Sequence, residues 1–232
     1  MTSEELKNAK FIDIHSHQGR EASKDVIIYS YNPGINSSPS KGQLFSIGIH
    51  PWSINDTDIE EHWNILKENI QSNDLVFIGE AGIDLTINVS LKEQEEILLR
   101  HIQLSEEHKR PLILHVVKSQ QEILKIRKES KAEQGWILHD YNGNKQMIEQ
   151  CLKYSGLYFS IGPRFFNSPN SKIAKDLMSI PIDRLLFETD DQTTFSIERI
   201  YTEYSKLSNI RIEELKGIIE SNFKRLLPYY EE

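Results

Sequence analysis

Cysteine is almost absent from this chain, since Cys151 is the only one among its 232 residues. An internal disulfide is therefore impossible, and a metal cluster built on thiolates is excluded. Cys151 lies in the segment MIEQCLKY, whose helical spacing predicts a packed thiol and not a nucleophile. Any catalysis has to rest on other side chains.

Long apolar runs and an excess of basic residues are also missing. No run approaches the roughly 20 apolar residues of a membrane helix, and the opening MTSEELKNAK lacks the apolar core of a signal peptide, so we expect a cytoplasmic protein without a membrane partner. The 35 acidic and 27 basic residues give a net charge of -8, which argues against a large basic surface for nucleic acid. A substrate that carries phosphate would need positive charge supplied locally. The oligomeric state is left open, and a monomer is compatible with the sequence.

What the sequence does contain is an alternation of short apolar runs and longer amphipathic segments. Eight runs have the length and content of buried strands: 11–17, 25–31, 44–50, 75–83, 111–115, 136–140, 157–162 and 184–190. Helical spacing is found at 58–72, 94–110, 119–133, 144–155, 171–179, 196–208 and 212–226.

Repeated strand–helix units predict an α/β fold with a parallel sheet and helices outside it. Eight strands are enough to close a (β/α)8 TIM barrel, and we expect one such domain over residues 1–232. The segments 18–24 and 32–43 are short and rich in Gly, Pro, Ser and Asn, which is unlike ordinary barrel helices. We therefore expect the early βα units to be trimmed to loops.

Several of the apolar runs end in a residue of a metal-binding type. In FIDIHSH, His15 and His17 alternate with Ser16, so both imidazoles project from one strand face. In the later runs the remaining candidates directly follow the apolar stretches VFIG, LIL and WIL and the stretch LLFET: Glu80, His115, His139 and Asp190. A barrel brings the carboxyl ends of its strands to one face, so these six side chains should meet in one cavity.

For any single histidine, packing or hydrogen bonding at a strand end is an equally good explanation. Burying four imidazoles and two carboxylates together without a metal, however, would cost several kcal/mol. The set suits Zn²⁺, Mn²⁺ or a related divalent ion, and its size is the natural capacity for two ions.

The other charged and polar candidates are less distinctive. His62, His101 and His108 lie within helical patterns, which predicts surface or packing roles. His50 ends LFSIGIH and should face the cavity, as a substrate or supporting contact or equally as a strand cap. Arg164, at another strand end, is a candidate phosphate clamp, with a surface arginine as the alternative.

The chain resembles the TatD-type metal-dependent hydrolases of the amidohydrolase superfamily, usually described as TatD DNases. The resemblance covers nearly the whole chain and rests on eight blocks in order: IDIHSH (12–17), SIGIHPW (46–52), FIGEAGIDL (77–85), PLILHVVKS (111–119), ILHDYNG (137–143), SIGPRFF (160–166), LLFETDD (186–191) and SNFKRL (221–226). It implies a TIM barrel with two divalent ions, such as Zn, Mg or Mn. One ion would be held by His15, His17 and Asp190 and the other by His115 and His139, with Glu80 as the bridge.

Our leading hypothesis is that the two ions hydrolyse a phosphodiester, most plausibly at a DNA end or in a single strand. Asp190 is the best candidate to accept the proton from the attacking water, while Glu80 holds the ions at their working distance. Asp13 either orients one imidazole or pairs with a backbone amide.

The chain departs from the family pattern in its short early loops, in Asp191-Gln192 after Glu-Thr-Asp, and in the block His-Asp-Tyr-Asn-Gly at 139–143. Because loops select the substrate, its identity stays open. One alternative is hydrolysis of a cyclic amide or ester, although such members of the superfamily typically bridge their ions with a carbamylated lysine. The other is a metal-stabilised, non-catalytic subunit of a nucleic-acid-processing assembly.

Overall fold

A ring of eight parallel strands forms the centre of the computed structural model, which describes Leu6 and residues 9–18, 24–55, 58–167, 172–192 and 194–227. The strands pair in sequence order: β1 (Ile12–Ser16), β2 (Val26–Tyr31), β3 (Phe45–Ile47), β4 (Leu75–Asp84), β5 (Leu112–Val117), β6 (Trp136–Leu138), β7 (Leu157–Ile161) and β8 (Leu185–Phe187). The ring closes beyond β8, where Asp190 N donates to His15 O at 2.9 Å and His17 N donates to Asp190 O at 3.0 Å. The predicted TIM barrel is confirmed.

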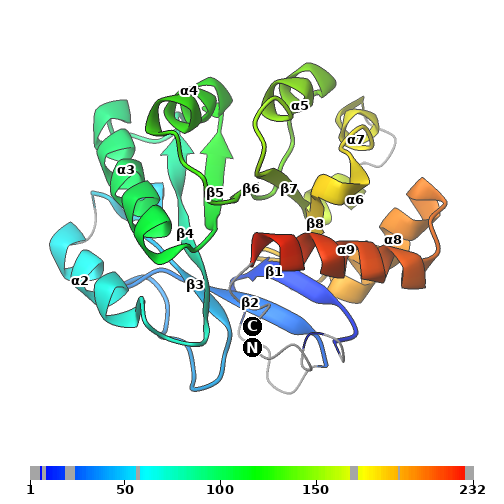
Figure 1. The fold of residues 1–232 in the computed structure, drawn as a ribbon, viewed down its shortest axis with the longest axis horizontal. Coiled ribbons are helices and arrows are strands. Elements are labelled where there is room, and N and C mark those ends of the chain that lie inside the picture. Colours follow the sequence, from blue (N-terminus) through cyan, green and yellow to red (C-terminus); the bar gives the residue numbers. More distant parts are fainter. Residues whose placement is uncertain are drawn as a thin grey trace.

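Helices surround the strands on the outside of the ring (Figure 1). They are α2 (Ile59–Asn69), α3 (Leu91–His108), α4 (Gln120–Ser130), α5 (Lys145–Cys151), α6 (Pro163–Asn167), α7 (Lys172–Leu177), α8 (Ile197–Ser208) and α9 (Ile212–Leu226), with short 3₁₀ turns η1 (Pro51–Ser53) and η2 (Ile182–Arg184). Each of the seven predicted helical segments contains a helix. None of the helices in the described ranges has the length and apolar character needed to cross a bilayer.

In the described part of the early βα units, the connecting segment is a loop and not a helix. The connection from β2 to β3 contains turns and extended backbone but no helix, as predicted for residues 32–43. Most of the other predicted loop, residues 19–23 of 18–24, lies outside the described residues. The short helix α6 was not predicted, because five residues are too few to display a helical period.

The start of α3 shows how local chemistry fixes an element boundary. Ser90 and Glu93 form a reciprocal cap, in which Ser90 Oγ accepts from Glu93 N at 3.2 Å and Glu93 Oε2 accepts from Ser90 N at 3.1 Å. The helix therefore begins at Leu91, three residues before the predicted segment at 94. It ends at His108 and is followed by the C-cap Lys109, whose left-handed backbone has a φ of 52°.

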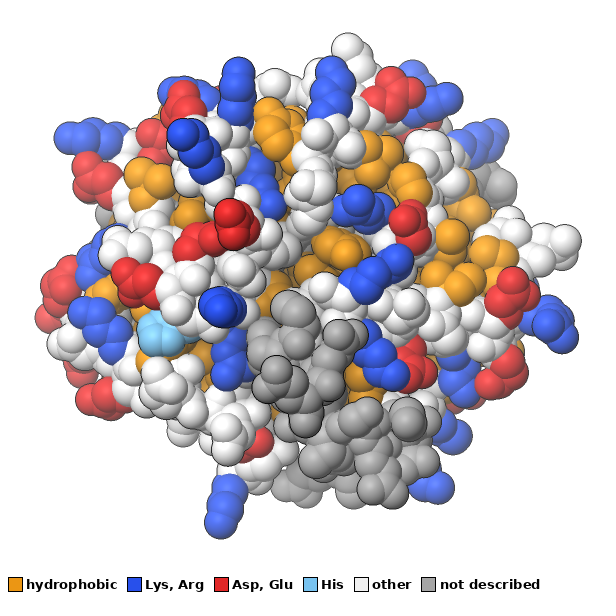
Figure 2. Space-filling model, in the orientation of Figure 1, with side chains coloured by type: hydrophobic (Ala, Val, Ile, Leu, Met, Phe, Trp, Pro, Cys, Tyr) orange, Lys and Arg blue, Asp and Glu red, His pale blue; other side chains and the backbone are white. Residues whose placement is uncertain are grey.

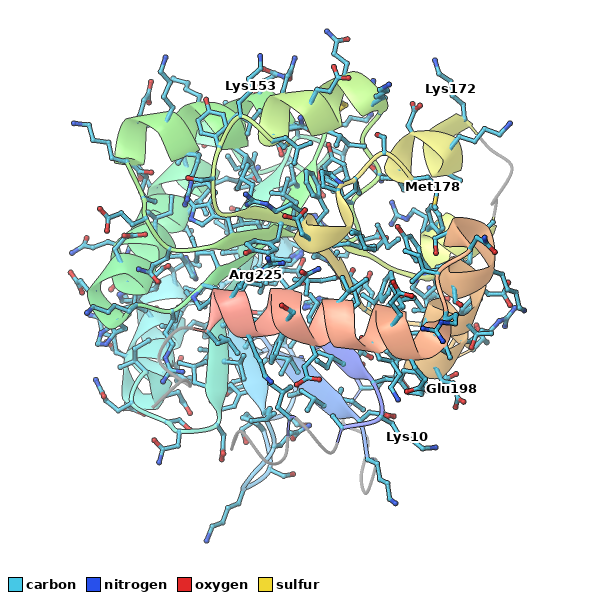
Figure 3. The ribbon with its side chains drawn as sticks, turned by 45° about the vertical axis from the view of Figure 1, so that its right-hand side comes forward. Lys10, Lys153, Lys172, Met178, Glu198 and Arg225 are labelled. Atoms are coloured by element: carbon cyan, nitrogen blue, oxygen red, sulfur yellow. The ribbon has the colours of Figure 1, made fainter. Side chains whose placement is uncertain are left out.

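The barrel separates an apolar interior from a charged exterior. Every residue of β4 is buried, and its Phe77 packs against Phe223 of α9 with ring centroids 6.0 Å apart. Lys153, in the turn after α5, and Lys172, in α7, point outward (Figure 3). On the face in Figure 2, basic and acidic side chains are interspersed, in keeping with the absence of a basic excess in the sequence.

Gly79 lets β4 lie close to β5 just before Glu80. Its backbone has a φ of 116°, and a Cβ at this position would meet the carbonyl oxygen of Ile113 at 2.3 Å. Only glycine fits such a position without moving the neighbouring strand. The sequence Ile-Gly-Glu thus places a carboxylate directly after a tight contact between two strands.

His101 ties α3 to the loop that carries His50. It is fully buried, with Nδ1 2.8 Å from Ile97 O and Nε2 accepting a hydrogen bond from Ile49 N at 3.1 Å. The predicted packing role is therefore confirmed for His101. Burial lowers the pKa of His101 from 6.5 to about 4.

This depressed pKa predicts a stability that falls with acidity. Between pH 6.5 and 4 the unfolded chain binds a proton at His101 and the folded chain does not, so stability is present above pH 6.5 and is lost as the pH falls. At pH 5 the loss from this residue is about 2 kcal/mol. We expect urea unfolding with EDTA present to show a smaller change between pH 7 and 5 for His101→Gln than for the parent. Parallel pH profiles of the two proteins would contradict this prediction.

Candidate metal centre

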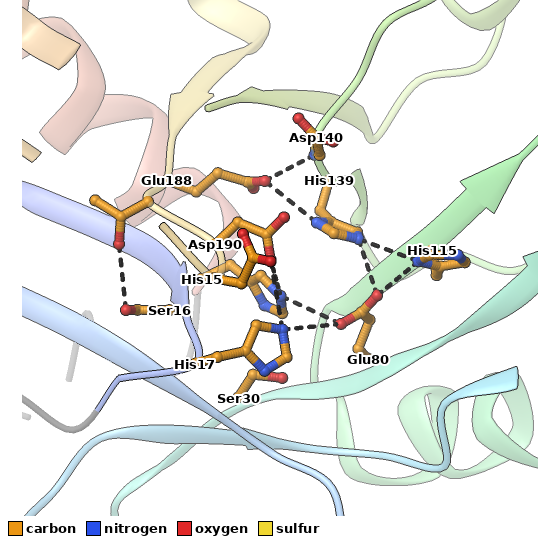
Figure 4. A network of polar contacts seen from close by, with 12 residues as sticks. His15, Ser16, His17, Ser30, Glu80, His115, His139, Asp140, Glu188 and Asp190 are labelled. Carbon is orange, nitrogen blue, oxygen red and sulfur yellow. Dashed lines mark hydrogen bonds and ion pairs between the residues drawn. The ribbon is translucent and has the colours of Figure 1, made fainter. Parts of the chain in front are cut away.

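The six side chains predicted as metal ligands meet at the carboxyl ends of the strands. His17, Glu80, His115, His139 and Asp190 line a cavity of about 700 Å³, and fully buried His15 lies directly behind it (Figure 4). Glu80 lies within β4 and His115 within β5. His15 lies within β1, one residue before its end, and His17 follows that strand. His139 and Asp190 lie beyond β6 and β8, because the runs 136–140 and 184–190 leave the sheet after Leu138 and Phe187. Three of the six candidates thus follow a strand, and the other three lie within one.

Glu80 is the centre of this cluster, and its two carboxylate oxygens face different histidines. Oε2 lies 3.2 Å from His15 Nε2 and 3.7 Å from His17 Nε2. Oε1 lies 2.8 Å from His115 Nδ1 and 2.9 Å from His139 Nε2. Burial opposes ionisation, but the surrounding imidazoles, with His139 the strongest influence, hold the pKa of Glu80 well below its usual range. The carboxylate is thus charged and shared between two groups of ligands.

Asp190 completes the group on the Oε2 side. Its Oδ1 lies 3.4 Å from His17 Nε2 and 3.8 Å from His15 Nε2. The Asp190 backbone has a φ of 53°, at the bridge that closes the barrel. Burial raises the pKa of Asp190, but His17 and His15 outweigh it and bring the pKa to about 2. Asp190 is therefore ionised at neutral pH.

His50 lies closer to the centre than a substrate contact would require. Its Nε2 is 3.0 Å from Glu80 Oε1 and 3.2 Å from His115 Nδ1, so it joins the candidate ligands on the Oε1 side. Its Nδ1 accepts a hydrogen bond from Trp52 N at 3.1 Å and caps η1. His50 therefore faces the cavity, as one alternative predicted, and the element that it caps is η1 and not the strand of the other alternative.

Two buried carboxylates that the sequence did not single out support the histidines. Glu188 Oε1 lies 3.2 Å from His139 Nδ1 and accepts from Asp140 N at 2.8 Å. Asp84 Oδ2 lies 3.3 Å from His115 Nε2. Such carboxylates orient a ligand imidazole and raise its basicity. Sequence spacing offered a signal, since Asp84 lies four residues after Glu80 in β4 and Glu188 lies two residues before Asp190 in the segment that follows β8.

Asp13 pairs with a backbone amide, which is one of the two roles that the sequence allowed. Its Oδ1 accepts from Thr189 N at 3.0 Å and its Oδ2 accepts from Thr189 Oγ1 at 2.7 Å. Asp13 thereby joins β1 to the segment that follows β8. The positions of His15 and Asp190 are set in part by this link, because each lies within two residues of a partner in it.

Arg164 reaches the rim of the cavity from α6. Its Nη2 lies 2.6 Å from Asp140 Oδ2, and its side chain is 66% exposed. Among the described residues that line the cavity, it is the only lysine or arginine. Any positive charge that side chains supply for a phosphate inside the cavity therefore comes from Arg164 or from the histidines.

The donor set fits divalent metal ions. Three groups of side chains have ligand atoms within 4.8 Å of one another: His15, His139 and Asp190; His15, His17 and Glu80; and His50, Glu80 and His115. His15 Nε2 is buried and makes no hydrogen bond, although it lies 3.2 Å from Glu80 Oε2, so its lone pair is available to a metal ion. Burial lowers the pKa of His139, but Glu80 and Glu188 raise it well above 6.5, so a metal would displace a proton there.

Comparison of the sequence with known proteins identifies a family and several relatives. Residues 36–228 match the family model described as TatD related DNase. YabD of Bacillus subtilis, an uncharacterized metal-dependent hydrolase, is 31% identical over 199 residues, which cover 78% of this chain and 76% of YabD. YcfH of Escherichia coli, also an uncharacterized metal-dependent hydrolase, is 28% identical over 198 residues, 79% of this chain and 73% of YcfH.

Solved structures agree with this result at the level of the fold. The crystal structure of YjjV, a TatD homologue from Escherichia coli, superposes with a TM-score of 0.78 over 93% of this chain and 97% of its own, at 18% sequence identity. A TatD family hydrolase from Entamoeba histolytica gives a TM-score of 0.73 at 19% identity, over 94% of this chain and 98% of its own. The family resemblance predicted from the sequence is confirmed, and the chain belongs to the TatD family of metal-dependent hydrolases.

Proposed function

We propose that this protein is a two-metal phosphodiesterase that acts on DNA, at an end or in a single strand. The observation that carries the proposal is the carboxylate of Glu80, whose two oxygens face two separate groups of histidines. A carboxylate in this position can bridge two ions. His15, His17 and Asp190 would hold one ion, and His115 and His139, joined by His50, would hold the other.

Two metal ions bound in this way would lower the pKa of a bound water, orient the scissile phosphate and neutralise charge on the attacking and leaving oxygens. Asp190 then accepts the proton of the attacking water, since it is ionised and lines the cavity with a side chain that is 22% exposed. Arg164 contacts a phosphate oxygen with its planar guanidinium, and this contact would replace its ion pair with Asp140.

The donor chemistry bears on the choice of metal. Imidazole suits Zn²⁺, whereas Mg²⁺ and Mn²⁺ are better suited by oxygen ligands, and Mg²⁺ keeps several waters. A cluster with as many imidazoles as this one therefore favours zinc over magnesium.

Two observations favour a phosphodiester over the alternatives. The bridging position is occupied by Glu80 and not by the lysine that cyclic amide hydrolases carbamylate, and the matching family model is described as a DNase. A non-catalytic metal scaffold would have a closed ligand shell, whereas Asp190 and His17 line an open cavity.

The test is a metal-reconstituted assay. Protein stripped with EDTA and reloaded with Zn²⁺, Mn²⁺ or Mg²⁺ is given end-labelled single-stranded DNA, a simple phosphodiester and a cyclic amide in parallel. We expect DNA cleavage with at least one ion and none of the amide. Cleavage of the amide alone would favour the amidohydrolase alternative, and inactivity on all three would favour the scaffold.

Removal of metal should also lower the thermal stability. A ligand present at 100 times its dissociation constant stabilises the folded state by about 2.7 kcal/mol. We expect the melting temperature to fall by several degrees in EDTA and to recover on addition of Zn²⁺ or Mn²⁺. An unchanged melting temperature after verified metal loading would argue against ions bound by the folded cluster.

A further inference from the structure

Trp52 is an exposed aromatic ring at the edge of the candidate metal centre. It lies in η1, two residues after His50, and lines the same cavity as Glu80 and His115. Its exposed fraction is 61%, whereas Trp63 and Trp136 are 5% and 0% exposed. The ring therefore offers a large apolar surface inside a cavity that is otherwise rich in polar groups.

This ring is held in a defined orientation. The indole Nε1 donates to Asp84 Oδ2 at 2.8 Å, and the backbone N of Trp52 donates to His50 Nδ1 at 3.1 Å. Asp84 is itself fixed by a hydrogen bond from Thr86 N at 2.8 Å. The indole stands nearly perpendicular to the imidazoles of His50 and His115, with centroids 4.9 and 5.7 Å away. A surface fixed in this way loses little conformational entropy when a flat ligand is placed on it.

The charges of the cavity make such a contact valuable. Acidic side chains line it, including Asp84, Asp140 and Asp191, while Arg164 is the single lysine or arginine among the described lining residues. A polyanion therefore gains little from side-chain charge outside the metal centre. The volume of the cavity, about 700 Å³, is within the size range of small-ligand pockets and not of an extended nucleic-acid groove.

We propose that Trp52 is a stacking platform for the nucleobase next to the scissile phosphodiester. The inference rests on the proposed function and adds a requirement to it: the substrate carries a planar ring beside the bond that is cut. Every base has a π face, so a stacking platform discriminates a base from no base but only weakly among the four bases.

Binding without turnover gives the first test. The metal-loaded protein is titrated by calorimetry with dAMP and with deoxyribose 5-phosphate, which lacks the base. Stacking is worth about 5- to 150-fold in affinity, so dAMP should bind at least about 5-fold more tightly and should quench the tryptophan fluorescence. Equal affinities for the two ligands would overturn the inference. The fluorescence change reports on Trp52, because the other two tryptophans are buried.

Kinetics give the second test. Single-stranded oligonucleotides with a normal or an abasic terminal residue, at either end, are compared by kcat/KM. We expect the parent to prefer the normal terminus by at least about 5-fold and Trp52→Ala to reduce this ratio to about 1. Trp52→Phe keeps a ring but loses the bond to Asp84, and should retain most of the preference.

Leu85→Ala is the matched control, because Leu85 is 42% exposed but does not line the cavity, and its ratio should equal that of the parent. Metal content is measured for every variant. If both Trp52 variants lose metal but keep the parental ratio of kcat/KM for the normal and abasic termini, Trp52 serves only to position Asp84. This result would overturn the inference. If the parent cleaves no oligonucleotide, the proposed function fails and the calorimetric comparison still decides on stacking. If the parent cleaves oligonucleotides with normal and abasic terminal residues equally well, the proposed function stands but Trp52 is not a stacking platform.

Discussion

Glu80→Gln is expected to lower metal affinity by at least about 100-fold, since replacing even a group that only supports a metal ligand typically costs 10- to 100-fold. Glutamine has nearly the shape of glutamate, but it is neutral and one of its two terminal atoms is an NH₂ group that cannot bind a cation. In the present cluster each oxygen of Glu80 lies within 3.2 Å of a histidine nitrogen. The substitution would therefore remove both the bridge and the charge that holds two cations near one another.

The measurement is metal content by elemental analysis together with turnover on single-stranded DNA. Glu96→Gln is the matched control, because Glu96 is exposed on α3 and its contact with Lys92 is a surface pair of small energetic value. We expect this control to equal the parent in both measurements. Full metal occupancy with parental turnover in Glu80→Gln would remove Glu80 from the bridging position.

The sequence was sufficient for the parts of the site that depend on position along a strand. An apolar run that ends in a polar residue predicts a strand end, and the barrel closure then brings distant strand ends together. His115 and His139 could be placed in one cavity in this way, although they are separated by an entire helix. The same reasoning located Asp190 beyond β8.

The parts that sequence analysis missed depend on side-chain direction. Glu188 and Asp84 were included in apolar runs or their margins, and nothing in a linear pattern tells which imidazole a buried carboxylate will meet. The contact of Glu188 with His139 joins two segments whose spacing across the barrel is set by register and packing. His50 was placed correctly at the cavity, but its distance of 3.0 Å from Glu80 depends on the turn η1.

The helix boundaries in the structure differ from the predicted ones because apolar periodicity does not report on helix ends. Apolar periodicity marks the buried face of a helix, whereas the ends depend on caps that are polar. Asp58 shows this at α2, where its side chain accepts from Glu60 N and Glu61 N and the helix starts at Ile59. Periodicity thus located the helices, and single polar residues set their limits.

Asp190→Asn is expected to leave the fold intact and nearly abolish hydrolysis. Asparagine keeps one carbonyl oxygen at the position of a ligand, but it cannot accept the proton of the attacking water and no longer offsets the charge of a cation. Loss of general-base assistance alone is typically worth about 10²- to 10⁴-fold in rate. The barrel closure should survive, because it uses the backbone N and O of Asp190, which the substitution retains.

Asp191→Asn separates this effect from a general loss of negative charge. Asp191 is the next residue, is exposed and lines the same cavity, yet its side chain contacts Gln192 and no histidine among the described residues. Thermal unfolding, metal content and turnover on single-stranded DNA are compared for the parent and the two variants. We expect Asp190→Asn to unfold near the parental temperature in EDTA, to bind less metal and to lose at least about 100-fold in turnover when metal is saturating. Asp191→Asn should keep both metal and turnover. Undiminished turnover of Asp190→Asn at full metal occupancy would mean that another group accepts the proton, whereas equal losses in both variants would point to the charge of the cavity mouth instead of a base at Asp190.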